Sequence, residues 1–214
     1  MIGPIPRNPK SEVRNPKSRL AILLSGRGSN FEAIAAAVES GKIREAEIVA
    51  VISDVPHARG LARARERRFP AHAVDGRLYP DRREHEEEIL RILETARPDL
   101  VCLAGYMRLL SPEFVARYRG RILNIHPSLL PKFPGLHAQR RALEAREPVS
   151  GCTVHFVDEG TDSGPVILQR RVPILPGDTE ESLSARILAE EHLAYPEAVS
   201  RVLERLAPVK LHRN

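Results

Sequence analysis

The fold is decided by the stretch Leu20-Ala21-Ile22-Leu23-Leu24-Ser25-Gly26-Arg27-Gly28-Ser29-Asn30. It opens with a continuous apolar run, which is typical of a strand that is buried on both faces. Two glycines follow, and apolar residues then recur at helical spacing from Phe31 to Val38, until Gly41 ends the pattern. The stretch therefore predicts a strand, a glycine turn and a helix.

The same alternation continues outward from this unit. Further apolar runs predict strands at 48–52, 71–74, 100–104 and 121–125. Amphipathic patterns predict helices at 59–68, at 89–97 and near 112–118, the second of which ends near Arg97 because Pro98 restricts that residue. Apolar strands that alternate with helices predict a doubly wound α/β fold, with a mostly parallel sheet covered on both faces.

The pattern changes after about residue 150. The strand-like runs 154–157 and 166–172 are separated only by residues 158–164, which leave no room for a crossover helix. We expect these strands to pair as antiparallel neighbours or to lie at a sheet edge. A final helix is expected to begin near Thr179 with Asp178 as its cap, and to run toward Leu206 with an interruption at Pro196.

The excess positive charge lies at the ends of the chain. Of the formal net charge of +5, residues 1–18 contribute +3 and residues 207–214 contribute +2, so residues 19–206 sum to zero. We expect 1–18 to be a disordered basic N-terminal tail, 19–206 to be a single domain and 207–214 to be a C-terminal tail. A neutral domain is a poor surface for tracking phosphates, so no nucleic-acid partner is expected.

Composition also indicates the compartment. The chain has no apolar segment long enough to span a bilayer and no secretory signal. Cys102 and Cys152 stand alone in apolar stretches and are expected to be buried free thiols, as in a reducing compartment. The sequence therefore predicts a cytoplasmic protein with no membrane partner.

The glycine turn is the first candidate site. Free backbone N–H groups at the start of a helix attract anions, and Gly26 and Gly28 would let the backbone approach a phosphate. The alternative is a tight turn in which Ser29 or Asn30 caps the helix, and spacing alone does not decide between the two. Phe31 stands where a dinucleotide-binding motif needs its third glycine, and no Gly-Lys-Ser/Thr follows.

Asn124 and His126 form the second candidate site. They are two residues apart at the carboxyl end of a predicted strand, so their side chains project from the same face. The alternative is a histidine that is satisfied by a nearby carbonyl in a proline-rich loop. The position at the strand end and the paired asparagine favour function.

Two acidic residues are weaker candidates. Asp162 lies in the run 158–164, whose acidic residues and glycines are ordinary for a surface turn. Glu191 stands where the apolar stripe of the last helix would place an apolar side chain. Burying a carboxylate at such a position costs free energy unless the carboxylate has a partner. The alternative, which explains the position of Glu191 almost as well, is that Pro196 shifts the helical phase of the apolar stripe. No spacing of His, Cys, Asp or Glu predicts a metal site.

Several motifs together resemble the phosphoribosylglycinamide formyltransferase family, over about residues 20–206. They are Ser25–Asn30, Leu103–Arg108, Asn124–Pro131, Pro134–His137 and Asp162–Pro165. The resemblance implies a Rossmann-like formyltransferase fold with an antiparallel edge. It also implies transfer of the formyl group of 10-formyltetrahydrofolate, as cosubstrate, to the amine of glycinamide ribonucleotide, without a metal.

The resemblance assigns binding roles. Gly28, Ser29 and Asn30 would hold the substrate phosphate, and Glu191 would face its ribose and glycinamide. The folate residues would be Met107, Arg108, Leu109 and Leu110 around the pterin, Asn124 at the reacting end, and Arg83 beside the polar tail.

It also assigns catalytic roles to Asn124, His126 and Asp162. Asn124 and a protonated His126 would stabilise the tetrahedral oxyanion, and Asp162 would favour the imidazolium and position a water that moves a proton. Methionyl-tRNA formyltransferase and formyltetrahydrofolate hydrolase share this arrangement, but the flanking segments are too short for their extra domains. A non-catalytic nucleotide-binding module remains the alternative of another class, and the sequence leaves monomer and homodimer open.

Overall fold

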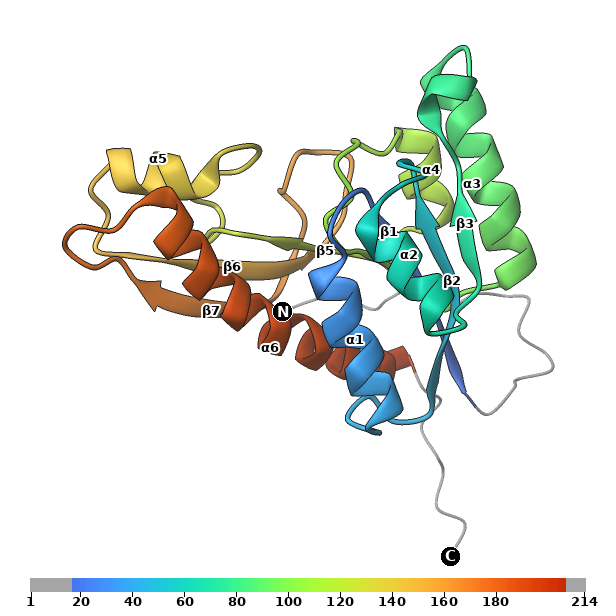
Figure 1. Ribbon diagram of the computed structural model, residues 1–214, viewed down its shortest axis with the longest axis horizontal. Helices are drawn as coiled ribbons and strands as arrows, with labels where there is room; N and C mark the ends of the chain where they lie inside the picture. The colour runs from blue at the N-terminus through green and yellow to red at the C-terminus, as the bar shows by residue number, and fades with distance from the viewer. Residues whose placement is uncertain (1–16, 207–214) are drawn as a thin grey trace, which may run out of the picture.

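The computed structural model describes residues 17–206, so the predicted tails lie outside the described residues except for Lys17 and Ser18. Ser18 is already the first residue of a strand. The described chain forms one seven-stranded sheet in the order β3-β2-β1-β4-β5-β6-β7 (Figure 1). Its strands are β1 (Ser18–Leu24), β2 (Ala46–Ser53), β3 (Ala71–Ala73), β4 (Leu100–Leu103), β5 (Ile122–His126), β6 (Val149–Phe156) and β7 (Val166–Pro173).

Strands β1 to β5 pair in parallel, which confirms the predicted doubly wound arrangement for this part of the sheet. The connections carry the helices α1 (Ser29–Glu39), α2 (Arg59–Glu66), α3 (Arg82–Ala96) and α4 (Pro112–Arg117), and a 3-10 turn, η1 (Gly76–Leu78). The helices cover both faces because side chains of a strand alternate between them. In β1, Leu20, Ile22 and Leu24 join the core under α1, whereas Ala21 and Leu23 join the core under α3.

The other end of the sheet is antiparallel. β6 and β7 pair antiparallel, as predicted from the short 158–164 connection, and β6 also pairs antiparallel with β5. A further short helix, α5 (Ala138–Glu144), lies between β5 and β6 and was not predicted. Its sequence gives little signal, since only Ala138 and Ala142 of its residues are buried.

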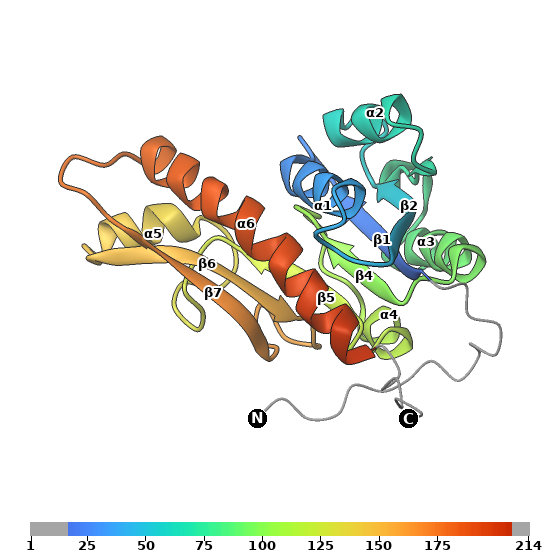
Figure 2. The same cartoon turned by 90° about the horizontal axis from the view of Figure 1, so that it is seen from below.

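The last helix, α6 (Glu180–Leu206), packs on α1, β6 and β7 and crosses one face of the sheet (Figure 2). The predicted interruption at Pro196 is wrong, because the helix continues through this residue. Proline removes one backbone donor, but Tyr195, Ala198 and Val199 beside it are fully buried. Packing of this segment offsets the lost hydrogen bond.

The predicted cap of α6 is also wrong. Thr179, rather than Asp178, caps the helix: its Oγ1 accepts a 3.2 Å hydrogen bond from the Ser182 backbone N–H, and Ser182 Oγ accepts one of 3.0 Å from Thr179 N–H. Asp178 instead accepts from the Leu175 N–H at 2.7 Å and pairs with Arg186. It therefore fixes the turn that leads into the helix.

Within residues 17–206 no helix has both the length and the apolar character that a bilayer crossing requires. Cys102 and Cys152 are buried and free, as predicted. Burial raises the pKa of both thiols to about 12, so they remain protonated.

Candidate active site

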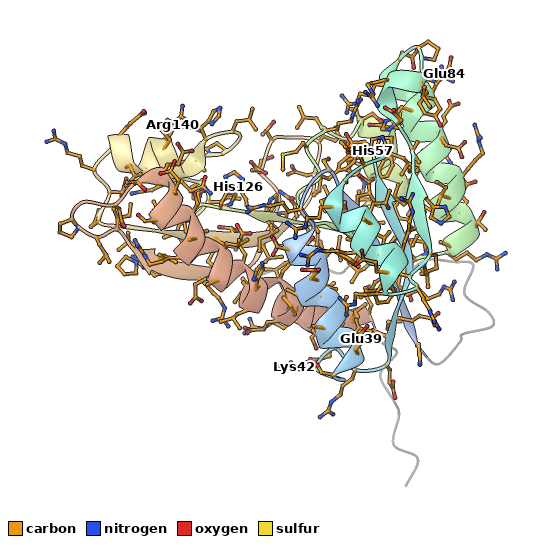
Figure 3. All side chains as sticks on the ribbon, in the orientation of Figure 1. Glu39, Lys42, His57, Glu84, His126 and Arg140 are labelled. Carbon is orange, nitrogen blue, oxygen red and sulfur yellow. The ribbon has the colours of Figure 1, made fainter. Side chains whose placement is uncertain are left out.

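The candidate site lies at the carboxyl end of β5. Leu123 and Ile125 of this strand join the core under α1 and α6, so Asn124 and His126 face the opposite side of the sheet. His126 is 5% exposed and Asn124 is half-buried. In Figure 3 His126 lies in the middle part of the molecule, below Arg140 and well away from Glu84.

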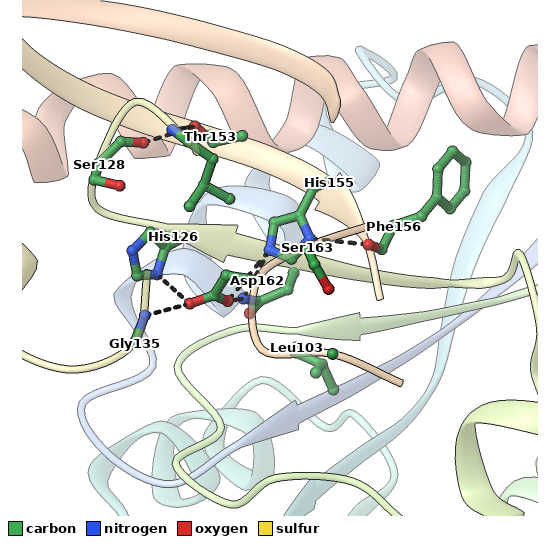
Figure 4. A network of polar contacts seen from close by, with 12 residues as sticks. Leu103, His126, Ser128, Gly135, Thr153, His155, Phe156, Asp162 and Ser163 are labelled. Atoms are coloured by element: carbon green, nitrogen blue, oxygen red, sulfur yellow. Dashed lines mark hydrogen bonds and ion pairs between the residues drawn. The ribbon is translucent and has the colours of Figure 1, made fainter. Parts of the chain in front are cut away.

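Asp162 reaches both of these residues from the loop between β6 and β7 (Figure 4). Its Oδ2 lies 3.1 Å from Nδ1 of His126 and accepts a 2.8 Å hydrogen bond from the Gly135 N–H. Its Oδ1 accepts a hydrogen bond of 3.3 Å from Nδ2 of Asn124. The structure thus brings Asp162, which residue spacing alone left as an ordinary turn residue, to the predicted pair of Asn124 and His126.

The backbone of the loop directs Asp162 inward. Asp158 Oδ1 accepts hydrogen bonds from the Gly160 N–H at 3.1 Å and from the Ser163 hydroxyl at 2.7 Å, which closes the turn. Gly164 passes so close to β6 that a Cβ there would lie 1.9 Å from the Phe156 carbonyl oxygen. Asp162 itself is left-handed, with φ of 52°, a conformation that aspartate tolerates better than most residues.

The Asp162 carboxylate is ionised in this site. Burial raises its pKa, but hydrogen bonds from His155 and Gly135 and the nearby His126 lower it more, and the pKa falls to about 2. Asp162 therefore carries a negative charge at neutral pH.

The pKa of His126 lies below its ordinary value. Burial lowers it, and this outweighs the Phe133 carbonyl and Asp162, which raise it. The expectation that the Asp162 carboxylate keeps His126 protonated is therefore not met in this site, because burial of the ring disfavours the imidazolium. Both ring nitrogens nevertheless face acceptors, since Nε2 lies 2.9 Å from the Phe133 carbonyl oxygen. A neutral imidazole can donate to only one of them, whereas an imidazolium would donate to both.

His155 belongs to the site but was not predicted from the sequence. It lies opposite Asn124 in the antiparallel β5–β6 register, is 2% exposed, and its Nε2 lies 3.2 Å from Asn124 Nδ2 and 3.5 Å from Asp162 Oδ1. Residues opposite each other in such a pair share a face. The available signal was a histidine inside the otherwise apolar run 154–157, but only the register shows which residue it meets.

The glycine turn leads from β1 into α1. Gly28 is the N-cap in a left-handed conformation, with φ of 75°, and no side chain caps the helix. The alternative in which Ser29 or Asn30 caps α1 is therefore wrong. The first N–H groups of the helix stay available to an anion, because the cap supplies no side-chain acceptor.

Asn30 and Glu191 meet across the helix pair α1–α6. Both are buried, and Asn30 Nδ2 donates a 2.7 Å hydrogen bond to Glu191 Oε2. Burial raises the pKa of Glu191, and the bond from Asn30 opposes this without cancelling it. One turn later in α6, the buried Tyr195 hydroxyl lies 3.0 Å from the carbonyl oxygens of Leu103 and Leu123 and so ties this part of the helix to the sheet. The Glu191 carboxyl group therefore lies on the buried face of α6, and the alternative in which Pro196 shifts the phase of the apolar stripe is wrong.

The predicted folate residues Met107–Leu110 lie together, whereas Arg83 lies elsewhere on the molecule. Met107 and Leu109 are 71% and 67% exposed, Leu110 packs against the core, and Arg108 pairs with Asp54 at 3.0 Å. Arg83 lies apart on α3, where it is 85% exposed and pairs with Glu87. It lines a shallow hollow of about 390 Å³ to which none of residues 107–110 contributes.

No group of three or more His, Cys, Asp or Glu among the described residues could hold a metal ion. The polar groups gathered at β5 are those of acid, base and amide chemistry. This arrangement suits stabilisation of an oxyanion and movement of a proton.

The chain is similar to proteins of one known family. Residues 18–199 match the family model described as "Formyl transferase". Phosphoribosylglycinamide formyltransferase of Escherichia coli K12 is 43% identical over 195 residues, which cover 91% of each chain. The trifunctional purine biosynthetic protein adenosine-3 of Drosophila pseudoobscura is 50% identical over 203 residues, but the match covers 15% of its length.

Solved structures give the same result. Glycinamide ribonucleotide transformylase 1 from Symbiobacterium toebii superposes with a TM-score of 0.86 at 47% identity, covering 92% of this chain and 93% of that one. The phosphoribosylglycinamide formyltransferase from Brucella melitensis superposes with a TM-score of 0.83 at 48% identity, and the match covers 90% of this chain and 98% of that one. The chain therefore belongs to the formyl transferase family and, within it, to the phosphoribosylglycinamide formyltransferases, as its motifs predicted.

Proposed function

We propose that this protein transfers the formyl group of 10-formyltetrahydrofolate to the amine of glycinamide ribonucleotide in de novo purine biosynthesis. The name of the Escherichia coli relative, which matches along most of both chains, supports this activity. The insect relatives are named as purine biosynthetic proteins, and this chain spans about 15% of their length. Only the formyl transfer is proposed here for this chain.

The observation that carries the proposal is the position of the Asp162 carboxylate. Its oxygens lie 3.1 Å from His126 Nδ1 and 3.3 Å from Asn124 Nδ2, at the carboxyl end of β5. Ligand sites of open α/β sheets lie at this edge. Formyl transfer needs such a cluster, because charge develops on one oxygen while a proton changes place.

The ribonucleotide would bind between the glycine turn and α6. Backbone N–H groups at Gly28, Ser29 and Asn30 would hold its phosphate at the start of α1. Glu191 would face the ribose and glycinamide, and its bond to Asn30 sets its orientation.

The folate would lie against the segment 107–110. The exposed Met107 and Leu109 offer apolar surface that a pterin ring would cover, beside Arg108 and Leu110. Asn124 would meet the reacting end of the cosubstrate. Arg83 would lie near the polar tail, in keeping with its exposed position on α3.

In the reaction, the amine nitrogen forms a bond to the formyl carbon, and the carbonyl electron pair moves onto oxygen. Asn124 donates to this oxyanion; a donor in such a position contributes roughly 3–4 kcal/mol to lowering the barrier. The bond from the formyl carbon to the folate nitrogen then breaks. The folate nitrogen keeps the electron pair and takes up the proton lost by the amine, carried by a water that Asp162 positions.

His126 would take up a proton from solvent as the oxyanion forms and return it to solvent when the intermediate collapses. Burial disfavours the imidazolium beforehand, but a nearby oxyanion adds negative charge and favours it. The Asp162 carboxylate and the Phe133 carbonyl are in place to accept from both ring nitrogens. His126 would then stabilise the tetrahedral intermediate electrostatically.

A formyl-transfer assay with each substrate omitted in turn tests the proposal. We expect formylated amine and tetrahydrofolate in equal amounts only when both substrates are present. Deformylation of the folate without an amine acceptor would indicate a hydrolase instead. Nucleotide binding with no turnover in the complete mixture would indicate a non-catalytic module.

We further propose that residues 19–206 carry this activity as a single domain in the cytoplasm, with small molecules as partners and without nucleic acid or membrane. The basic tails would take no part in the reaction. Monomer and homodimer are both compatible with a site built from one chain.

A further inference from the structure

The segment Gly105–Leu110 follows β4 and contains most of the proposed folate residues. Among the described residues, each hydrogen bond from this segment to another part of the chain goes to Ser25 or Asp54. Ser25 N–H donates to the Gly105 carbonyl at 3.0 Å, and Met107 N–H donates to Ser25 Oγ at 2.9 Å. The segment is thus anchored at the end of β1.

Asp54 ties these contacts together. It is buried just after β2, and its Oδ1 accepts a 2.6 Å hydrogen bond from the Ser25 hydroxyl. Its Oδ2 accepts one of 3.0 Å from Nε of Arg108. One carboxylate therefore orients the hydroxyl that holds Met107 and, at the same time, the side chain of Arg108.

The Arg108 side chain also lies close to the backbone of η1. Its guanidinium lies against Gly76, where an added Cβ would approach Nη2 within 2.2 Å. The Arg108 side chain is 42% exposed, so without Asp54 it would gain rotamer freedom in water.

The glycine turn does not depend on Asp54 in the same way. Gly60 N–H donates to the Gly26 carbonyl at 3.0 Å, and the Gly28 and Gly60 backbones touch so closely that neither has room for a Cβ. The turn that would hold the ribonucleotide is therefore fixed by backbone contacts, whereas beyond Gly105 the hydrogen bonds that hold the folate segment go to the side chains of Ser25 and Asp54.

We infer that Asp54 is a positioning residue for the folate cosubstrate, which acts through Ser25 and Arg108 to hold Gly105–Leu110 in its binding conformation. The inference rests on the proposed function and deepens it. Asp54 touches no reacting atom in this scheme. Its loss should weaken folate binding selectively, leaving ribonucleotide binding and the chemical step largely intact.

The test compares Asp54→Asn, Ser25→Ala and the double variant with the wild-type protein. Asp54→Asn keeps the side-chain shape and removes the charge, and Ser25→Ala removes the hydroxyl but keeps the backbone bond to Gly105. Glu39→Gln is the matched control, because Glu39 pairs with Arg67 at 2.6 Å and lies far from His126 in Figure 3. Thermal unfolding of each variant shows whether it is folded at the assay temperature; Ser25→Ala carries the test if Asp54→Asn is not.

Steady-state kinetics give KM for each substrate, and calorimetry with tetrahydrofolate gives a direct Kd for a folate that cannot react. We expect Asp54→Asn and Ser25→Ala each to raise the folate KM and Kd roughly 3- to 10-fold, a loss of about 1 kcal/mol. KM for glycinamide ribonucleotide should change less than about twofold. The double variant should be little worse than Asp54→Asn, since both changes break one chain of contacts.

A folate Kd that is unchanged in both single variants, or an equal loss for both substrates, would overturn the inference while leaving the proposed function standing. An inactive wild-type protein in the complete assay would overturn the proposed function, and the inference with it.

Discussion

Asn30 donates a 2.7 Å hydrogen bond from Nδ2 to Oε2 of Glu191, although 161 positions separate the two residues. The bond joins the first turn of α1 to the middle of α6 and holds a carboxylate that is 7% exposed. Asn30 Oδ1 is buried and finds no hydrogen-bond partner among residues 17–206. A buried charge and an unused acceptor reduce stability, which is typical of residues kept for binding.

Glu191→Gln should stabilise the protein at neutral pH and weaken ribonucleotide binding. Burial raises the folded-state pKa of Glu191 above its unfolded value, so ionisation of this group favours the unfolded state. The wild type should therefore lose stability relative to Glu191→Gln as pH rises from about 4, the unfolded pKa, until the folded-state pKa is passed. KM for glycinamide ribonucleotide should rise roughly tenfold.

Urea unfolding of both proteins at several pH values measures this difference. A gap that is constant across pH would mean that Glu191 is equally ionised in the folded and unfolded states.

Gly28→Ala should damage both the fold and the ribonucleotide site. Gly28 has φ of 75°, and an added Cβ would lie 2.5 Å from Cα of Gly60. Strain and overpacking of this kind cost about 1–3 kcal/mol each. Gly26→Ala is the control, since a Cβ there meets nothing within 4 Å. Thermal unfolding and the ribonucleotide KM should change in the first variant only; similar losses in both would show that flexibility of the turn, rather than its packing, is what matters.

His126→Ala should lower kcat roughly 100- to 1,000-fold with little change in either KM, because the imidazolium is needed only when the oxyanion forms. Calorimetric titration with each substrate alone checks that binding is retained. A rise in KM at unchanged kcat would instead assign His126 to ground-state binding.

Asp162→Asn should remove stability that depends on pH, as well as activity. The folded-state pKa of Asp162 is about 2, below its unfolded value, so the ionised carboxylate stabilises the protein above about pH 4 and this contribution is lost as pH falls toward 2. The difference corresponds to about 2 kcal/mol at pH 7. Denaturant unfolding should show the wild type more stable than the variant at pH 7 and nearly equal to it near pH 2; a variant that is equally stable at pH 7 would contradict the hydrogen-bonded environment of Asp162.

The sequence predicted the elements well where one face or both faces of a segment are apolar. The strands β1, β2 and β4 read as continuous apolar runs because they are buried on both sides of the sheet. α5 was missed because it buries few residues, and Asp178 was taken as a cap because Asp and Thr are both good caps at adjacent positions.

What the sequence determined by itself was local: the alternation that sets a parallel sheet, the glycine turn before α1, and the common face of Asn124 and His126, which follows from their spacing on one strand. Tertiary structure alone decided that Asp162 turns inward, that His155 stands opposite Asn124, and that Glu191 meets Asn30. These three depend on loop closure, strand register and helix packing. Each is fixed by contacts between segments far apart in the chain, which residue spacing does not encode.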